Sequence, residues 1–153
     1  MHIVAIHLAP GRRLPTRAVS SVVAEAGKGL VGDRYHGTRH RHVTIQSQQL
    51  LDEAAEELGR HVDAGATRRN ITVDAGDIPT KPGTRLRIGD VELEVVRVSA
   101  PCRLLDDGIG PGAAAALRRR AGSVCRLLSS GTIAVGDSVD ITPRPDHDVH
   151  TVL

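Results

Sequence analysis

The amino-acid sequence predicts a mostly β domain, a barrel or a sandwich, with about eight short strands and two helices. Short aliphatic runs recur at close spacing and are separated by glycine-containing turns, which is the pattern of small barrels and sandwiches. Within residues 91–98, apolar and acidic residues alternate, as in a strand with one buried face. The 153 residues are enough for one domain with a buried core. We expect residues 1–142 to form this domain and residues 143–153 to be a C-terminal tail.

The first half of the chain contains four predicted strands, one irregular loop and one helix. Aliphatic and β-branched runs predict strands over residues 3–8, 18–24, 43–45 and 71–73. Four glycines fall between Gly27 and Gly37, so this segment is predicted to be a loop shaped by backbone conformations that glycine permits. Residues 48–58 place their apolar side chains on one helical face, and this predicts a helix capped by Ser47 and ended by Gly59.

The second half of the chain is predicted to be mainly strands. Apolar runs predict strands over residues 84–88, 91–98, 124–128, 132–135 and 138–141. Gly-Asp dipeptides at 89–90 and 136–137 predict tight connections between neighbouring strands. The segment Gly110-Pro111-Gly112 precedes an alanine-rich run, which predicts a short helix over residues 113–120.

Composition excludes several classes of protein. The chain carries 20 Lys+Arg against 18 Asp+Glu, and Tyr35 is the one aromatic residue among Phe, Trp and Tyr, so we expect no nucleic-acid partner. No apolar run approaches the roughly 20 residues of a membrane span, and the N-terminal residues resemble a strand more than a signal peptide. Two cysteines cannot form a disulfide scaffold. These features predict a cytoplasmic protein without a membrane partner.

Cys102 is the main candidate for chemistry. It follows Pro101 at the end of a predicted strand, so its thiol is expected in a loop, where it could be a metal ligand or a nucleophile. The alternative is an inert buried cysteine. Cys125 lies within a predicted strand and is expected in the core. The cysteines are 23 positions apart without a Cys-x-x-Cys pair, which argues against a zinc site.

Basic residues gather in two segments. Arg34, His36 and Arg39, together with His40, Arg41 and His42, lie beside the glycine-rich loop, and Arg68, Arg69 and Asn70 precede the strand at 71–73. Arginine binds phosphate in a bidentate manner, and glycine allows backbone amides to approach an anion. These segments could therefore bind a phosphorylated cofactor, or they could be solvated basic surface.

The ordered set of motifs resembles the MOSC domain, named for the C-terminal region of molybdenum cofactor sulfurase. The resemblance spans residues 30–141, most of the chain. It rests on the loop Gly29-Leu30-Val31-Gly32-Asp33-Arg34, the strand at 43–45 with its helix, and the segments 68–73, 86–94, 101–102, 110–112 and 131–137.

This resemblance implies a closed β-barrel of complex topology, similar to the pyruvate-kinase barrel, and a molybdopterin-type molybdenum cofactor. Cys102 stands at the family's molybdenum-ligating position, and Arg68 and Asn70 match positions that hold the cofactor. His36 and Arg39 are looser matches near the site. Asp33 is expected to orient the loop. The resemblance leaves open whether the cofactor stays bound on purification and which oligomer forms.

Three functions follow from the resemblance. Well-studied members reduce N-hydroxylated small molecules with electrons from a separate reductase, while others are fused to a pyridoxal-phosphate-dependent sulfurase. The first hypothesis is therefore a molybdenum-dependent oxidoreductase. The second is a sulfur carrier or a C–S bond enzyme that uses Cys102 without molybdenum and receives sulfur from a donor protein. The third is a non-catalytic cofactor-binding module. Compared with the longer reductases, the chain has no N-terminal β-domain, so less protein is expected to cover the cofactor.

Overall fold

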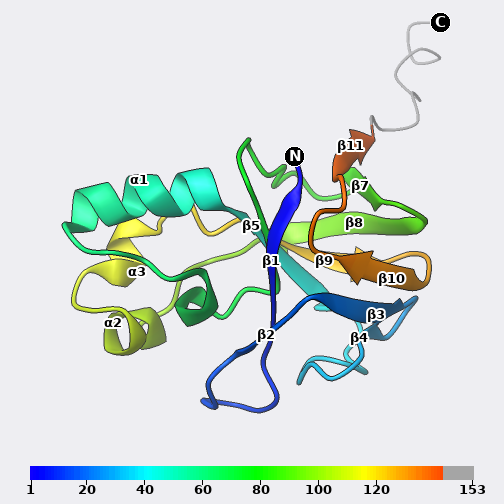
Figure 1. The fold of residues 1–153 in the computed structure, drawn as a ribbon, viewed down its shortest axis with the longest axis horizontal. Helices are drawn as coiled ribbons and strands as arrows, with labels where there is room; N and C mark the ends of the chain where they lie inside the picture. Colours follow the sequence, from blue (N-terminus) through cyan, green and yellow to red (C-terminus); the bar gives the residue numbers. More distant parts are fainter. Residues whose placement is uncertain (143–153) are drawn as a thin grey trace, which may run out of the picture.

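The computed structural model describes residues 1–142, which form two β-sheets and a group of short helices (Figure 1). The larger sheet has eight strands in the order β11-β7-β8-β9-β5-β6-β1-β2. The bounds of these strands are, in that order, Asp140–Thr142, Arg85–Ile88, Val91–Val98, Ser123–Leu127, Val43–Ser47, Ile71–Val73, Ile3–Leu8 and Arg17–Val19. The smaller sheet contains β10 (Gly131–Ala134), β3 (Ser21–Glu25) and β4 (Gly29–Leu30). The predicted tail at 143–153 lies outside the described residues.

The larger sheet is a curled half-barrel that stays open, so the prediction of a closed barrel is wrong. Its end strands, β11 and β2, do not pair with each other. The residues before β1 instead meet the segment before β11, with an isolated bridge between His2 and Ser138. One physical cause lies in the predicted strand 18–24, which is interrupted at Ser20. Its first part, β2, pairs with β1, whereas its second part, β3, pairs with β10 in the small sheet, so the ladder does not continue around.

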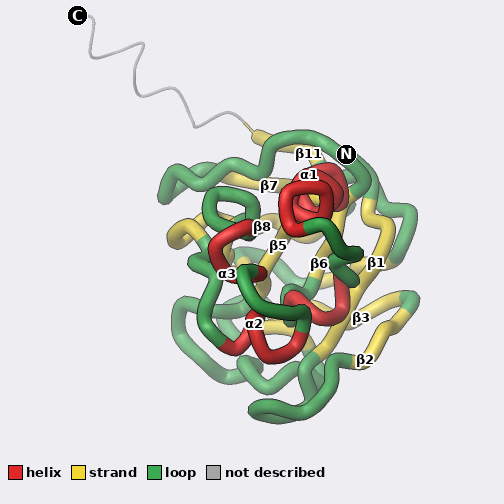
Figure 2. The backbone as a smooth tube through the Cα atoms, turned by 90° about the vertical axis from the view of Figure 1, so that its left-hand side faces the viewer, coloured by secondary structure: helices red, strands yellow, loops and turns green. Residues whose placement is uncertain are grey.

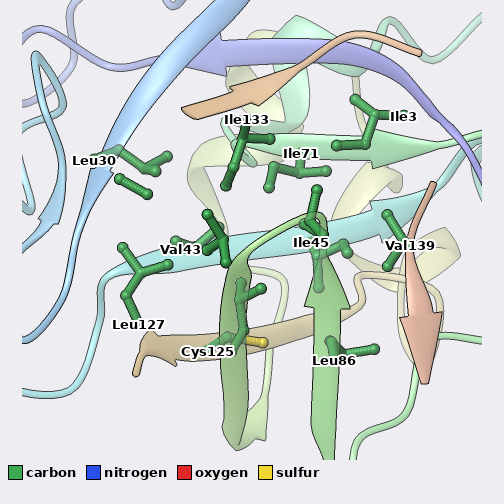
Figure 3. Close-up of a cluster of buried hydrophobic side chains, with 14 of the residues drawn as sticks. Ile3, Leu30, Val43, Ile45, Ile71, Leu86, Cys125, Leu127, Ile133 and Val139 are labelled. Carbon is green, nitrogen blue, oxygen red and sulfur yellow. The ribbon is translucent and has the colours of Figure 1, made fainter. Parts of the chain in front are cut away.

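The core between the strands is aliphatic, as the scarcity of aromatic residues requires (Figure 3). Ile45, Ile71, Leu86 and Ile133 are fully buried within it. Cys125 is also fully buried, which confirms the prediction that it is a core residue, and burial raises the pKa of its thiol to about 12. Cys125 is therefore held as an uncharged thiol at neutral pH.

The helices lie together on one side of the larger sheet, and Figure 2 looks onto that side. They are α1 (Gln48–Leu58), α2 (Leu104–Gly108) and α3 (Ala113–Ala116), with a 3-10 helix η1 (Ala64–Thr67). Their apolar side chains form a second buried cluster, made of Leu51, Ala54, Val62, Leu105, Ala113, Ala116 and Leu117. In the part of the chain that the structure describes, no helix is long and apolar enough to span a membrane.

The predicted helix at 48–58 and the predicted strands at 3–8, 71–73 and 91–98 are confirmed, and several other predicted elements differ in detail. Gly59 ends α1 in a left-handed conformation with its N–H donating to Ala55 O at 2.8 Å. Ser47 stands at the N-cap in an extended conformation, but its side chain makes no capping hydrogen bond. The helix predicted over 113–120 already ends at Ala116. The sequence did not predict α2 and η1, because helices of four or five residues are too short for a periodic pattern. Within the glycine-rich segment, which was predicted to be irregular throughout, Gly29–Leu30 forms a two-residue strand.

Gly122 is needed where the backbone before β9 passes β5. Its φ is +78°, and a Cβ atom there would lie 1.8 Å from the carbonyl oxygen of Ile45. We expect Gly122→Ala to lower the free energy of unfolding by about 3 kcal/mol or more, because the backbone of one strand must move. Gly136→Ala is the matched control, since its φ is +97° and a Cβ there meets nothing within 4 Å. Strain alone should cost about 1–2 kcal/mol in that variant. Equal losses in urea unfolding would contradict this explanation.

Candidate functional site

Cys102 lies at the edge of a cavity of about 180 Å³ whose lining is rich in arginine. Three loops supply its charged side chains and its thiol: residues 31–42 between β4 and β5, residues 68–70 between η1 and β6, and residues 99–103 between β8 and α2. We call it the arginine cavity and define it by Arg34, Tyr35, Arg41, Arg68, Arg69 and Cys102. Loops far apart in the sequence thus bring four guanidinium groups and one thiol together.

The structure places Cys102 in a loop, with an exposed side chain. The loop leaves β8 after Ser99, whose N–H donates to Gly122 O at 2.9 Å. The carbonyl of Cys102 then accepts a hydrogen bond from the N–H of Leu105 at 3.0 Å, which begins the first turn of α2. The thiol is therefore held between a strand end and a helix start, where solutes can reach it.

Arg69 is the most deeply buried charge of the cavity, with 8% of the residue exposed. Its Nη2 donates to the carbonyl of Ala100 at 3.1 Å, so it ties the Cys102 loop to the start of β6. Burial, and after it the nearby charge of Arg41, lowers the pKa of Arg69 to about 10, although Cys102 and Tyr35 act in the opposite direction. At neutral pH the guanidinium is still charged.

Tyr35 holds two further guanidinium groups. The Cζ atoms of Arg34 and Arg41 lie 4.6 Å and 4.2 Å from the centre of its ring, which is cation–π distance. The Nε atom of Arg41 is buried and has no hydrogen-bond partner within residues 1–142. The one aromatic residue of the chain thus orients two of the four arginines.

None of these four arginines lies within 4.0 Å of a carboxylate in residues 1–142. The ion pairs made by arginine there belong to Arg85, Arg120 and Arg126, which are outside the cavity. Four like charges that share one partly buried cavity without a counter-charge repel one another. A bound anion would remove that repulsion.

Arg68 is held by the loop that precedes β2. Its guanidinium donates to Leu14 O at 2.5 Å and to Gly11 O at 3.2 Å. Its backbone takes a left-handed conformation, with φ of +65°, at the C-terminal cap of η1. Arg68 lines the arginine cavity and also a larger neighbouring cavity. It therefore forms part of the wall between the two.

Asp33 and Asn70 lie behind the cavity and do not line it. Asn70 Oδ1 accepts hydrogen bonds from Thr44 N at 3.0 Å and Thr44 Oγ1 at 3.1 Å, and Asn70 Nδ2 donates to His7 O at 3.0 Å and to Asp33 Oδ1 at 3.3 Å. Asp33 also accepts from the N–H groups of Ala9 at 2.9 Å and Tyr35 at 3.3 Å. Both side chains are buried. They position the loop that carries Arg34 and Tyr35.

His36 and Arg39 do not reach the cavity. His36 Nε2 lies 2.8 Å from Glu25 Oε1 on the surface, and Arg39 is exposed. Of the predicted site residues, the structure therefore brings Cys102 and Arg68 together, with Asp33 and Asn70 behind them. The sequence placed Arg34, Arg41 and Arg69 in the two basic segments that could bind a phosphorylated cofactor, but it gave neither them nor Tyr35 an individual role in the site. The available signal was a lone aromatic residue within the basic segment.

Comparisons with known proteins agree on the fold. The family model of the MOSC domain matches residues 32–140. The YuaD protein of Bacillus subtilis is similar in structure, with a TM-score of 0.81 and 19% identity over 92% of this chain and 94% of that one. YiiM from Geobacillus stearothermophilus has a TM-score of 0.75 and 19% identity over 95% and 77% of the two chains. YiiM from Escherichia coli has a TM-score of 0.69 and 16% identity over 94% and 71%. No curated protein matches the chain.

His42 anchors the loop that carries Arg41, and it should make folding depend on pH. Its Nδ1 accepts a hydrogen bond from Leu127 N at 2.9 Å, and its Nε2 lies 2.8 Å from Thr38 O. Burial lowers the pKa of His42 below 6.5. The unfolded chain therefore binds a proton at a higher pH than the folded one, and the free energy of unfolding should decrease as pH falls below about 6.5.

The variant His42→Gln isolates this contribution from that of His7, whose pKa is also lowered by burial. We expect the variant to be less stable at pH 8 and to show a shallower loss of stability between pH 6.5 and pH 5 than the unsubstituted protein. Urea midpoints across this range provide the measurement. Parallel curves for the two proteins would contradict the assignment.

Proposed function

The chain belongs to the MOSC domain family, and from this premise we propose that it binds a molybdopterin-type molybdenum cofactor at the arginine cavity. In this proposal, Cys102 is the protein's ligand to the metal. One observation carries it: four arginines without carboxylate partners in residues 1–142 surround a single accessible thiol.

The charge of the cavity fits the anionic part of such a cofactor. Guanidinium groups bind phosphate oxygens through paired hydrogen bonds, and buried ones bind more strongly because little water competes. The buried Nε of Arg41 has no partner in residues 1–142 and is a donor available to an oxygen ligand. A volume of about 180 Å³ is below the usual range for whole small-molecule sites, so the cavity suits the anionic end of a large cofactor.

The donor set also fits a metal that brings most of its own ligands. The lining of the arginine cavity contains one thiol and neither an imidazole nor a carboxylate. In residues 1–142, no three side chains among His, Cys, Asp and Glu gather to hold a metal. A single soft sulfur from the protein suits a metal whose other ligands are the sulfur and oxygen atoms of its cofactor.

Each part of the cavity has a distinct task in this proposal. Arg69 and Arg41 balance the negative charge of the ligand and of the Cys102 thiolate. Tyr35 keeps two guanidinium groups in place, so little side-chain entropy is lost on binding. Asp33 and Asn70 fix the loop from behind. When bound, the cofactor supplies the redox chemistry, and the protein supplies binding, orientation and electrostatics.

For the activity, we propose the reduction of an N-hydroxylated small molecule. Two electrons and two protons convert the N–OH group into N–H and water, and the electrons come from a separate reductase protein. A sulfur-carrier function is the second candidate, and it is favoured by the exposure of the Cys102 thiol beside Arg69. There the thiolate takes the outer sulfur of a donor protein's persulfide, and the donor leaves as its thiolate.

Cofactor reconstitution tests the proposed site. We expect Cys102→Ala to retain at most a tenth of the molybdenum per protein that the unsubstituted chain takes up, measured by elemental analysis after incubation with released cofactor. Arg69→Gln and Arg41→Ala should weaken cofactor binding about tenfold, because each removes a charge-assisted hydrogen bond. Arg118→Ala is the matched control, since Arg118 is exposed and lies outside the cavity.

Equal molybdenum in the unsubstituted protein and in Cys102→Ala would disprove the ligand assignment. Mass spectrometry after incubation with a persulfide donor separates the second candidate. A sulfur atom added to the unsubstituted protein but not to Cys102→Ala, together with no molybdenum uptake, would favour the sulfur carrier.

A further inference from the structure

A second and larger cavity lies next to the arginine cavity. Its volume is about 770 Å³, which is within the usual range of small-molecule sites. It lies between β1, the loop before β2, η1 and α2, and it shares Arg68 and Leu104 with the arginine cavity. We call it the His7 cavity and define it by His7, Pro15, Asp63, Gly65, Ala66 and Leu104.

Two polar side chains pack closely against a glycine in one wall of the His7 cavity. A Cβ atom at Gly65 would lie 3.0 Å from His7 Nε2 and 3.1 Å from Asp63 Oδ2. The φ of Gly65 is outside the left-handed range, so its backbone conformation is open to other residues. What glycine provides here is a close approach, which brings both polar atoms to the same part of the cavity wall.

His7 Nε2 and Asp63 Oδ2 can act as a hydrogen-bond donor and a neighbouring acceptor. His7 Nδ1 is buried without a hydrogen-bond partner within residues 1–142. A buried N–H without a partner is less favourable than a buried acceptor without one, so we assign the proton of the neutral ring to Nε2, next to the carboxylate. Burial lowers the pKa of His7, while Asp63 opposes that shift, and the ring is uncharged at neutral pH. In this assignment His7 Nε2–H is a donor in the cavity wall and Asp63 Oδ2 is an acceptor beside it.

The rest of the lining favours a neutral ligand with a flat apolar body. Arg13 and Arg68 balance Asp63 and Asp107 in charge. The His7 cavity therefore has no strong preference for a charged ligand, whereas the arginine cavity favours an anion. Pro15, Ala66 and Leu104 provide apolar surface in the same lining as His7 and Asp63.

We propose that the His7 cavity binds a neutral planar molecule through an edge that carries an acceptor beside a donor, as in a primary amide or an aminopyrimidinone ring. The acceptor meets His7 Nε2–H and the donor meets Asp63 Oδ2. Such an edge occurs on a free small molecule and on the ring of a pterin, and the test below distinguishes these two sources. The site does not require the metal.

Benzamide is the first probe, titrated into the full chain free of metal. For a ligand of this size we expect a Kd on the order of 1 mM, read from the amide resonances of Gly65 and Ala66 or by calorimetry. N,N-dimethylbenzamide lacks the donor and benzoate carries a charge, so both should bind at least about tenfold more weakly. Equal binding of benzamide and its dimethyl derivative would overturn the proposal.

Two variants test the geometry. Gly65→Ala puts a methyl group against His7 Nε2 and Asp63 Oδ2 and should weaken benzamide binding at least about tenfold. Its tight contacts of 3.0 Å and 3.1 Å require both side chains to shift, so we expect a modestly lower unfolding temperature, and binding is measured well below it. Asp63→Asn should weaken binding to a similar degree. Asp77→Asn makes the same change of charge at an exposed position outside the cavity and should bind normally. Unchanged binding in Gly65→Ala would overturn the proposal.

The last experiment tests whether this site is independent of the proposed metal site. Cys102→Ala should bind benzamide as the unsubstituted protein does, so the two proposals can fail independently. Protein loaded with the cofactor is then titrated with benzamide. Lost binding identifies the cofactor's own ring as the occupant, and retained binding identifies a free molecule. If benzamide shifts only the amide resonances of residues outside the His7 cavity, the proposal is refuted for both kinds of ligand.

Discussion

The side-chain amide of Asn70 is the contact on which the arrangement of both cavities depends. It joins Thr44 on β5, the carbonyl of His7 on β1 and the carboxylate of Asp33 in the glycine-rich loop. Its amide carries two donors and a carbonyl with two acceptor positions, and all of these are used inside the protein. In a buried network each unpaired group would be unfavourable, so the network fixes the three segments together. Through Asp33, this network positions the loop that carries Arg34 and Tyr35.

Next to the Asn70 network, the four arginines of the arginine cavity are electrostatically unfavourable, because like charges are held close together in a partly buried place. Charged side chains are seldom buried without a partner, because desolvation is unfavourable. Here burial and Arg41 both lower the pKa of Arg69. A ligand that binds only the folded protein would shift the folding equilibrium toward the native state. Repulsion within the cluster therefore reduces the stability of the folded protein, and in our proposal the anionic ligand offsets it.

The sequence predicted local features better than long-range ones. Residues 48–58 and Cys125 could be predicted because helical period and apolar neighbours are local properties. The open form of the larger sheet could not be predicted, because closure of the barrel depends on the long-range pairing of the two strands on either side of Ser20. His36 and Arg39 were expected near the site because they lie in the basic segment and loosely match the family's loop. Both are exposed, outside the lining of the arginine cavity, and His36 meets Glu25 instead, since proximity in sequence does not specify where a side chain points.

The two cavities differ in charge although they share a wall. On one side of Arg68 lie three further arginines and no carboxylate in the lining; on the other side, acidic and basic groups balance. The guanidinium of Arg68 donates to two carbonyls of the loop before β2, and these hydrogen bonds hold it in place between the two cavities. An anionic group and a neutral group are thus favoured on opposite faces of one fixed side chain. A ligand that carries both would be oriented by charge alone, with its anionic end toward Cys102.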